Sequence, residues 1–187
     1  MIINMANTGF DCNIVIRADK MRSSGSTAYI KGLFQEFFSD WGFNITIKTD
    51  SGLDITTDAL LMTAAKGHYC GGGFCSSPLT LPDNGLIDIA VIKNISKLKL
   101  LQFLKKYHDG TCITDKKAQD FIKYTQCKEA DISVSKPQGI CLDGEIHTFS
   151  NAHFKCCPKS IKFIVPKGAE YTYRKIKNRR IKSNDNN

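Results

Sequence analysis

The chain has 187 residues, a length that fits one globular domain with at most a small appendage, since domains usually contain ~100 to 200 residues. Hydrophobic residues make up 42% and charged residues 24% of the sequence, which excludes a largely disordered or fibrous chain. No stretch approaches the roughly 18 apolar residues of a membrane-spanning helix, and residues 1–17 lack the basic-then-apolar order of a secretory leader. We therefore expect a cytoplasmic protein, whose eight cysteines are reduced thiols.

The net charge of +8 is unevenly distributed along the chain. Residues 174–187, RKIKNRRIKSNDNN, carry six basic residues and one acidic residue, and such a segment is usually solvated and flexible. We expect one domain over residues 1–173 followed by this tail, for which attraction to an anionic membrane surface is an alternative role. A nucleic-acid partner is not expected, because the body of the chain shows no reader motif and no basic stripe interleaved with aromatic residues.

The first half of the chain predicts strands and two helices. Residues 3–16 suggest two short β segments around a turn at Thr8 and Gly9, because β-branched residues are concentrated after Cys12. From Ser26 to about Ser39, apolar residues recur at three-and-four spacing, which predicts an amphipathic helix. Strands are expected at residues 43–49, 59–65 and 86–93, and a second helix runs from Ser96 to a stop at Asp109 and Gly110.

The second half predicts a series of short strands separated by turn residues. They are expected at residues 120–127, 130–135, 139–143, 145–150, 153–158, 160–166 and 169–174. Because no βαβ alternation runs through the chain, the pattern favours a mainly β fold with two helices, arranged as a two-layer β-sandwich.

Two glycine-containing segments are candidate binding loops. Gly71, Gly72 and Gly73 let a backbone approach a ligand closely, but they also suit a tight bend or bulge in a sheet, and they lack the Lys and Ser/Thr of a P-loop. Residues 81–88, LPDNGLID, place carboxylate and amide oxygens around a glycine, where they could bind a hard cation. Asp-Asn-Gly is equally typical of a turn between strands.

Asp143, Gly144 and Glu145 form the third motif. Asp-Gly suits a two-residue hairpin loop, and this explains the pattern without any function. Alternatively, two carboxylates on a rigid turn can face one cleft, where one of them acts as a base toward a substrate hydroxyl.

Taken in order, these segments resemble the C-terminal domain of the bacterial diacylglycerol kinase and lipid kinase family, which is related to sphingosine kinases and NAD kinases. The resemblance covers most of residues 4–167. It rests on N-x-x-x-x-G-F-D at residues 4–11, A-Y-I at 28–30, G-x-Y-x-G-G-G at 67–73, P-D-N-G-L-I-D at 82–88, the Leu-rich helix ending at Gly110, and D-G-E at 143–145.

The resemblance implies a β-sandwich that forms one wall of an interdomain cleft, in a kinase that transfers the ATP γ-phosphoryl group to a lipid hydroxyl at the membrane surface. Asp143 would be the general base, Glu145 would orient the acceptor or position Mg²⁺, and the glycines at 71–73 would line the cleft. A structural magnesium would be bound at Leu81, Asn84 and Leu86. Since Asn84 stands where the family has an aspartate, the resemblance implies weaker charge compensation for that metal.

The family's nucleotide-binding domain, with its G-G-D-G-T loop, has no counterpart in these residues. We therefore expect an isolated C-terminal half that does not transfer phosphate alone, a possible homodimer, and a location that includes the inner membrane face. A freestanding β-sandwich that binds a lipid or a protein without catalysis is the alternative from another class. A kinase with a nucleotide acceptor, as in NAD kinases, is a third.

Overall fold

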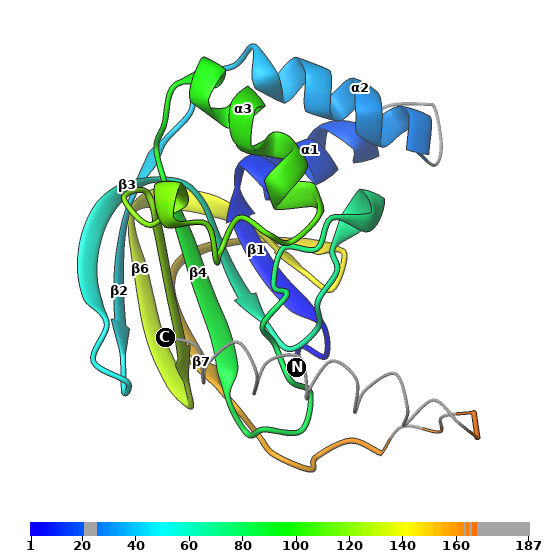
Figure 1. Ribbon diagram of the computed structural model, residues 1–187, viewed down its shortest axis with the longest axis vertical. Helices are drawn as coiled ribbons and strands as arrows, with labels where there is room; N and C mark the ends of the chain where they lie inside the picture. Colours follow the sequence, from blue (N-terminus) through cyan, green and yellow to red (C-terminus); the bar gives the residue numbers. More distant parts are fainter. Residues whose placement is uncertain (21–25, 163, 165, 168–187) are drawn as a thin grey trace.

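We describe a computed structural model of the chain, which covers residues 1–20, 26–162, 164 and 166–167. Its β-strands are β1 (Met5–Gly9), β2 (Phe43–Thr49), β3 (Asp54–Ala65), β4 (Ile87–Lys93), β5 (Ile122–Cys127), β6 (Glu129–Leu142) and β7 (Glu145–Lys155). The helices are α1 (Phe10–Asp19), α2 (Ser26–Phe37) and α3 (Lys97–His108), with short 3-10 turns at Gly71–Gly73 and Lys116–Ala118. The helices gather at one end of the strands (Figure 1).

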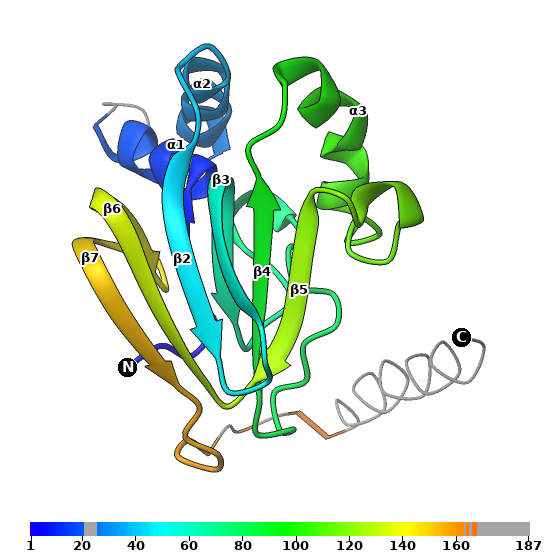
Figure 2. The ribbon, with the colours of Figure 1, turned by 90° about the vertical axis from the view of Figure 1, so that its left-hand side faces the viewer.

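The strands form one seven-stranded antiparallel sheet that closes partly on itself. Its order is β1-β6-β2-β3-β4-β5, with β7 on the free side of β6, and Figure 2 shows the strands from β7 to β5 side by side. Closure comes from β1, which pairs with β6 on one side and with the second half of β3 on the other. The predicted mainly β, sandwich-like fold is therefore confirmed.

Two long strands change partner along their length, and this bends the sheet. β3 pairs with β2 up to Ala59 and with β1 from Leu61, with an irregularity in its pairing with β4 between these two residues. In β6 the register with β7 shifts between Ser133 and Gln138. Pro137 lies in that irregular stretch, as expected for a residue that cannot donate to a ladder.

The helix α1 corrects one prediction. The β-branched residues after Cys12 suggested a strand, but the chain enters a helix directly from β1. Gly9, at φ 83°, makes the sharp change of direction, and Phe10 and Ile14 then lie one helical turn apart and are both buried. Burial of that face outweighs the weak preference of β-branched residues for strands. The described residues thus contain three α-helices where the sequence predicted two.

Most other predicted elements are confirmed. α2 begins at the predicted residue, α3 ends where Asp109 and Gly110 were expected to stop it, and β2 and β4 match their predicted ranges closely. The strands predicted at 130–135 and 139–143 fall in one strand, β6, which ends at Leu142. Those at 145–150 and 153–158 fall in β7, which ends at Lys155, so that residues 156–158 are not in a strand. The described residues of 160–166 are not in a strand, and residues 169–174 and the predicted tail lie outside the described part of the chain.

A buried glutamate joins α1 to α2. Glu36 is 1% exposed, and its carboxylate accepts hydrogen bonds from Arg17 Nε at 2.6 Å and Asn13 Nδ2 at 2.9 Å. Its backbone carbonyl accepts from Trp41 Nε1 at 2.8 Å. These bonds fix α2, and the chain that leaves it, against α1.

Candidate functional site

Asp143 and Gly144 form the predicted hairpin turn. Both residues have positive φ, 51° and 104°, and Leu142 pairs with Glu145 across the turn. Two residues with positive φ are the requirement of a type I′ turn, for which Asp-Gly is a preferred sequence. The turn interpretation of this motif is confirmed.

The Asp143 carboxylate binds the backbone at the start of the chain. Its Oδ1 accepts from the amide nitrogens of Asn4 at 3.0 Å and Met5 at 2.8 Å, and its Oδ2 accepts from Ile3 N at 2.6 Å. In return, the amide of Asp143 donates to the Met5 carbonyl at 2.9 Å. The side chain therefore anchors the approach to β1, while Glu145 is exposed and lies 3.8 Å from His147 Nε2.

Asn4 connects this turn to the glycine loop. Its carbonyl accepts from the amides of Lys66 and Gly67, and its Nδ2 donates to the Tyr69 carbonyl at 3.1 Å. Gly71, Gly72 and Gly73 follow two residues later as a 3-10 turn. Two of the predicted site segments are thus held at one end of the sheet by a common residue. The base role of Asp143 and the lining role of the glycines stay predictions.

The predicted metal ligands converge on a lysine ammonium. Lys66 Nζ lies 2.9 Å from the Leu81 carbonyl, 2.6 Å from the Leu86 carbonyl and 3.1 Å from Asn84 Oδ1. Asp88, which the sequence analysis grouped with this loop, instead accepts hydrogen bonds from Tyr124 Oη and Gln126 Nε2. In the described part of the chain, no three His, Cys, Asp or Glu side chains gather as a metal site would require. All eight cysteines are free thiols.

An apolar cavity lies between the helices and the sheet, next to the end of β1 where Phe10 begins α1. Its walls come from α1, α2, α3 and the sheet, and include Phe10, Leu33, Leu61, Phe103 and Phe121. The free space amounts to about 20 Å³, room for roughly one water molecule. Its lining is almost wholly hydrocarbon, with Asp11 as the acidic exception.

Asp11 is a functional candidate that sequence reasoning missed. It is 5% exposed, and burial raises its pKa from 3.8 to about 6, against the opposing effect of the hydrogen bond from Tyr107 Oη at 2.6 Å. A carboxyl with a perturbed pKa at the wall of an apolar cavity is a candidate functional group. The available signal was an acidic residue between Phe10 and Cys12, shortly before the apolar residues 14–16.

A single antiparallel sheet that closes partly on itself, with its helices gathered at one end, defines the chain as a sandwich-like β domain. The comparisons agree. The family described as the YegS C-terminal NAD kinase beta sandwich-like domain matches residues 4–165, and the chain belongs to that family.

Individual relatives are distant and longer. A "probable lipid kinase YegS-like" protein of Alcanivorax borkumensis is 25% identical over 171 residues, covering 89% of this chain and 55% of that protein. A protein of the same name from Shewanella frigidimarina is 26% identical over 121 residues, covering 65% of this chain and 37% of that protein. The chain therefore spans about a third to a half of these relatives.

Among solved structures, a diacylglycerol kinase from Bacillus anthracis superposes with a TM-score of 0.52 at 15% identity, covering 83% of this chain and 47% of that one. This similarity supports the fold. No helix in the described residues has the length and hydrophobicity needed to cross a bilayer.

Proposed function

We propose that this chain is the acceptor-side domain of an ATP-dependent lipid kinase and holds the acyl part of a diacylglycerol-type lipid between its helices and its sheet. The observation that supports this most directly is the apolar cavity with a single buried carboxyl, Asp11, at its wall. Apolar walls with few placed polar groups are typical of small-molecule sites, and such walls suit the acyl part of the lipid.

The cavity is closed in this structure, and an acyl chain needs more space than about 20 Å³. Leu33 on α2 and Leu104 on α3 both line it, so we expect lipid entry to require these helices to part. The surface above is suited to that event, because Phe34 on α2 and Leu101 on α3 are 67% and 53% exposed. We propose that this face meets the bilayer surface.

The phosphoryl donor belongs to the second half of the enzyme. ATP and Mg²⁺ would be bound there, where Mg²⁺ neutralises the charge of the transferring phosphoryl group. In the assembled enzyme Asp143 would accept the proton of the lipid hydroxyl, and Glu145 would orient the acceptor. This chain alone is then inactive. The cavity lies wholly within it, however, so it would still bind lipid, which a freestanding binding module would also do.

Phosphoryl transfer separates these functions. A protein in which a family nucleotide-binding domain is joined ahead of this chain should phosphorylate diacylglycerol in preference to NAD, and Asp143→Asn should reduce turnover at least 100-fold, as removal of a general base commonly does. Because Asp143 also anchors residues 3–5, the variant's melting temperature must be measured alongside. Asp131→Asn, an exposed aspartate on β6, is the matched control.

Near-normal turnover of Asp143→Asn would exclude the base role. Transfer to NAD alone would identify a nucleotide acceptor in place of a lipid. Saturable lipid binding without transfer by an otherwise folded, ATP-binding protein would favour the binding module.

A further inference from the structure

Three oxygen atoms of the loop between the glycine turn and β4 point at one position. They are the carbonyl oxygens of Leu81 and Leu86 and the side-chain Oδ1 of Asn84, and the position is occupied by Lys66 Nζ. An ammonium has three N–H donors and no acceptor. Each donor therefore has one oxygen partner, and the hydrogen-bonding capacity of the lysine is complete.

The rest of the local structure holds the lysine and the loop in this arrangement. The amide of Lys66 donates to the Asn4 carbonyl at 2.8 Å, which fixes the start of the lysine side chain directly after β3. Asn84 Oδ1 also accepts from the amide of Leu86 at 3.0 Å. The loop is thus closed on itself and tied to β3 by the same amide oxygen.

A resident magnesium does not fit these residues. Mg²⁺ prefers six oxygens at about 2.0–2.1 Å and usually includes carboxylate among them, whereas the three oxygens here belong to uncharged groups. A metal among them would lie against a positively charged ammonium, and none of the three oxygens belongs to a carboxylate that would offset the repulsion. By contrast, three neutral oxygens around a single positive charge match what an ammonium requires.

We propose that the ammonium of Lys66 takes the place of a structural metal ion in this chain, so that the loop at residues 81–86 is held by a cation built into the protein. In this arrangement Asn84 and Lys66 complement each other. The side chain of Asn84 is neutral and so lacks the negative charge that would recruit a metal, while Lys66 supplies the positive charge. The inference rests on the loop alone and is independent of the proposed function.

Thermal unfolding in EDTA and in excess MgCl₂ tests it. The unaltered chain should have the same melting temperature in both. Lys66→Met should melt lower by roughly 5 °C or more, since it leaves three loop oxygens without their charged donor, and Mg²⁺ should not restore it. Lys66→Met combined with Asn84→Asp should regain stability in Mg²⁺ but not in EDTA. Lys48→Met, in an exposed ion pair with Asp54, is the matched control and should change little.

A Mg²⁺-dependent rise in the melting temperature of the unaltered chain that Asn84→Ala abolishes would overturn the proposal. So would an unchanged melting temperature for Lys66→Met. If that variant does not fold, Mn²⁺ relaxation in the unaltered protein decides. Amide signals of Asn84 and Leu86 should keep their line widths as Mn²⁺ is added, and selective broadening of these two signals would place a metal at the loop.

Discussion

At the scale of single residues, the two aspartates of the candidate site differ in what their carboxylates face. Asp143 accepts hydrogen bonds from three backbone N–H groups, whereas Asp11 faces hydrocarbon and one hydroxyl. Burial is therefore the dominant effect at Asp11, where it raises the pKa to about 6. This difference gives Asp11 a measurable effect on stability.

The effect depends on pH in a definite direction. Between pH 4 and 6 the folded protein keeps a proton on Asp11 that the unfolded chain has released, so the free energy of unfolding falls as pH rises through this window. Above about pH 6 the penalty of the buried charge is constant. Asp11→Asn removes it. Asp11→Asn should therefore increase the free energy of unfolding by about 2 kcal/mol more at pH 7.5 than at pH 4.

Urea unfolding at the two pH values measures this difference. Asp19→Asn, at the exposed end of α1, is the control. An Asp11→Asn effect that does not change with pH would show that Asp11 is not desolvated in the folded protein.

At the scale of secondary structure elements, the junction between β1 and α1 is the feature on which the cavity depends. Gly9 has φ 83°, and a Cβ there would lie 2.4 Å from the Leu60 carbonyl and 2.5 Å from Phe43 Cε1. Gly52, in the turn between β2 and β3, has φ 93° but no atom within 4 Å of such a Cβ. The two glycines share the backbone requirement and differ in the available space.

Alanine substitution should separate the two contributions. Gly52→Ala should lower the free energy of unfolding by about 1 kcal/mol, the cost of left-handed backbone alone. Gly9→Ala should cost roughly 4 kcal/mol or more, because β3 must also move. Denaturant unfolding of both variants checks this, and equal costs would mean that the backbone at Gly9 is not confined by β3 as described.

The same junction marks what the sequence could predict about the elements. Strands with regular alternation, such as β2, and helices with clear periodicity and stop signals, such as α3, were predictable because local pattern and tertiary packing agree. α1 was not, since its β-branched residues match a strand locally and only burial of Phe10 and Ile14 decides for a helix. Hairpin chemistry identified the Asp143 turn. The same local signals could not show that Lys66 reaches the loop 15 to 20 residues later, because that contact depends on the sheet.

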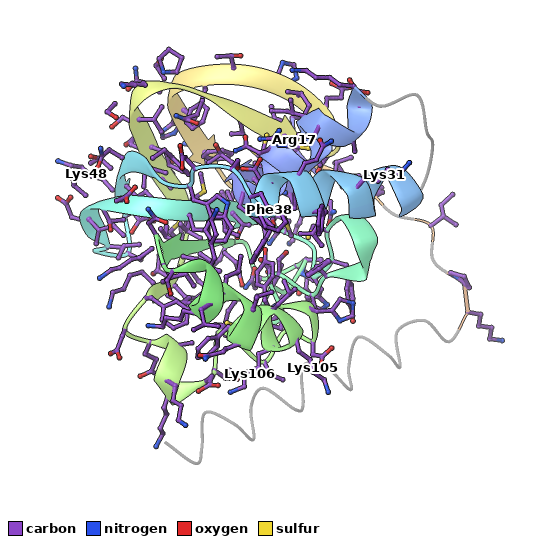
Figure 3. All side chains as sticks on the ribbon, turned by 90° about the horizontal axis from the view of Figure 1, so that it is seen from above. Arg17, Lys31, Phe38, Lys48, Lys105 and Lys106 are labelled. Atoms are coloured by element: carbon purple, nitrogen blue, oxygen red, sulfur yellow. The ribbon has the colours of Figure 1, made fainter. Side chains whose placement is uncertain are left out.

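At the scale of the whole molecule, the helices present an apolar surface with a basic border. Phe34, Phe38, Leu98 and Leu101 are between 53% and 67% exposed on or beside α2 and α3. Figure 3, which views this end, labels Phe38 near its centre, Lys31 on α2, and Lys105 and Lys106 on α3 toward its edge. Of these lysines, Lys106 is paired with Asp115. Aromatic and aliphatic side chains bordered by lysines are typical of proteins that dock on anionic bilayers.

Vesicle partitioning tests this surface. The chain should bind vesicles that contain anionic lipid more tightly than zwitterionic vesicles, and Phe34→Ser with Phe38→Ser should weaken the binding about tenfold by removing apolar area. Ile146→Ser, at an exposed isoleucine of β7, is the control. Equal losses for both variants would show that the bilayer does not meet the helical end.

Binding of a soluble short-chain diacylglycerol to this chain tests the account most directly. Dioctanoylglycerol should bind saturably and independently of ATP and Mg²⁺. Leu104→Trp, which fills the cavity, should weaken binding at least tenfold, while Gln102→Trp, at an exposed position of the same helix, should not. In the unaltered protein, acyl protons should show nuclear Overhauser contacts to the methyl groups of Ile14 and Leu100. Equal affinity in both tryptophan variants, with no contact to these methyl groups, would contradict the proposal that the cavity is the lipid site.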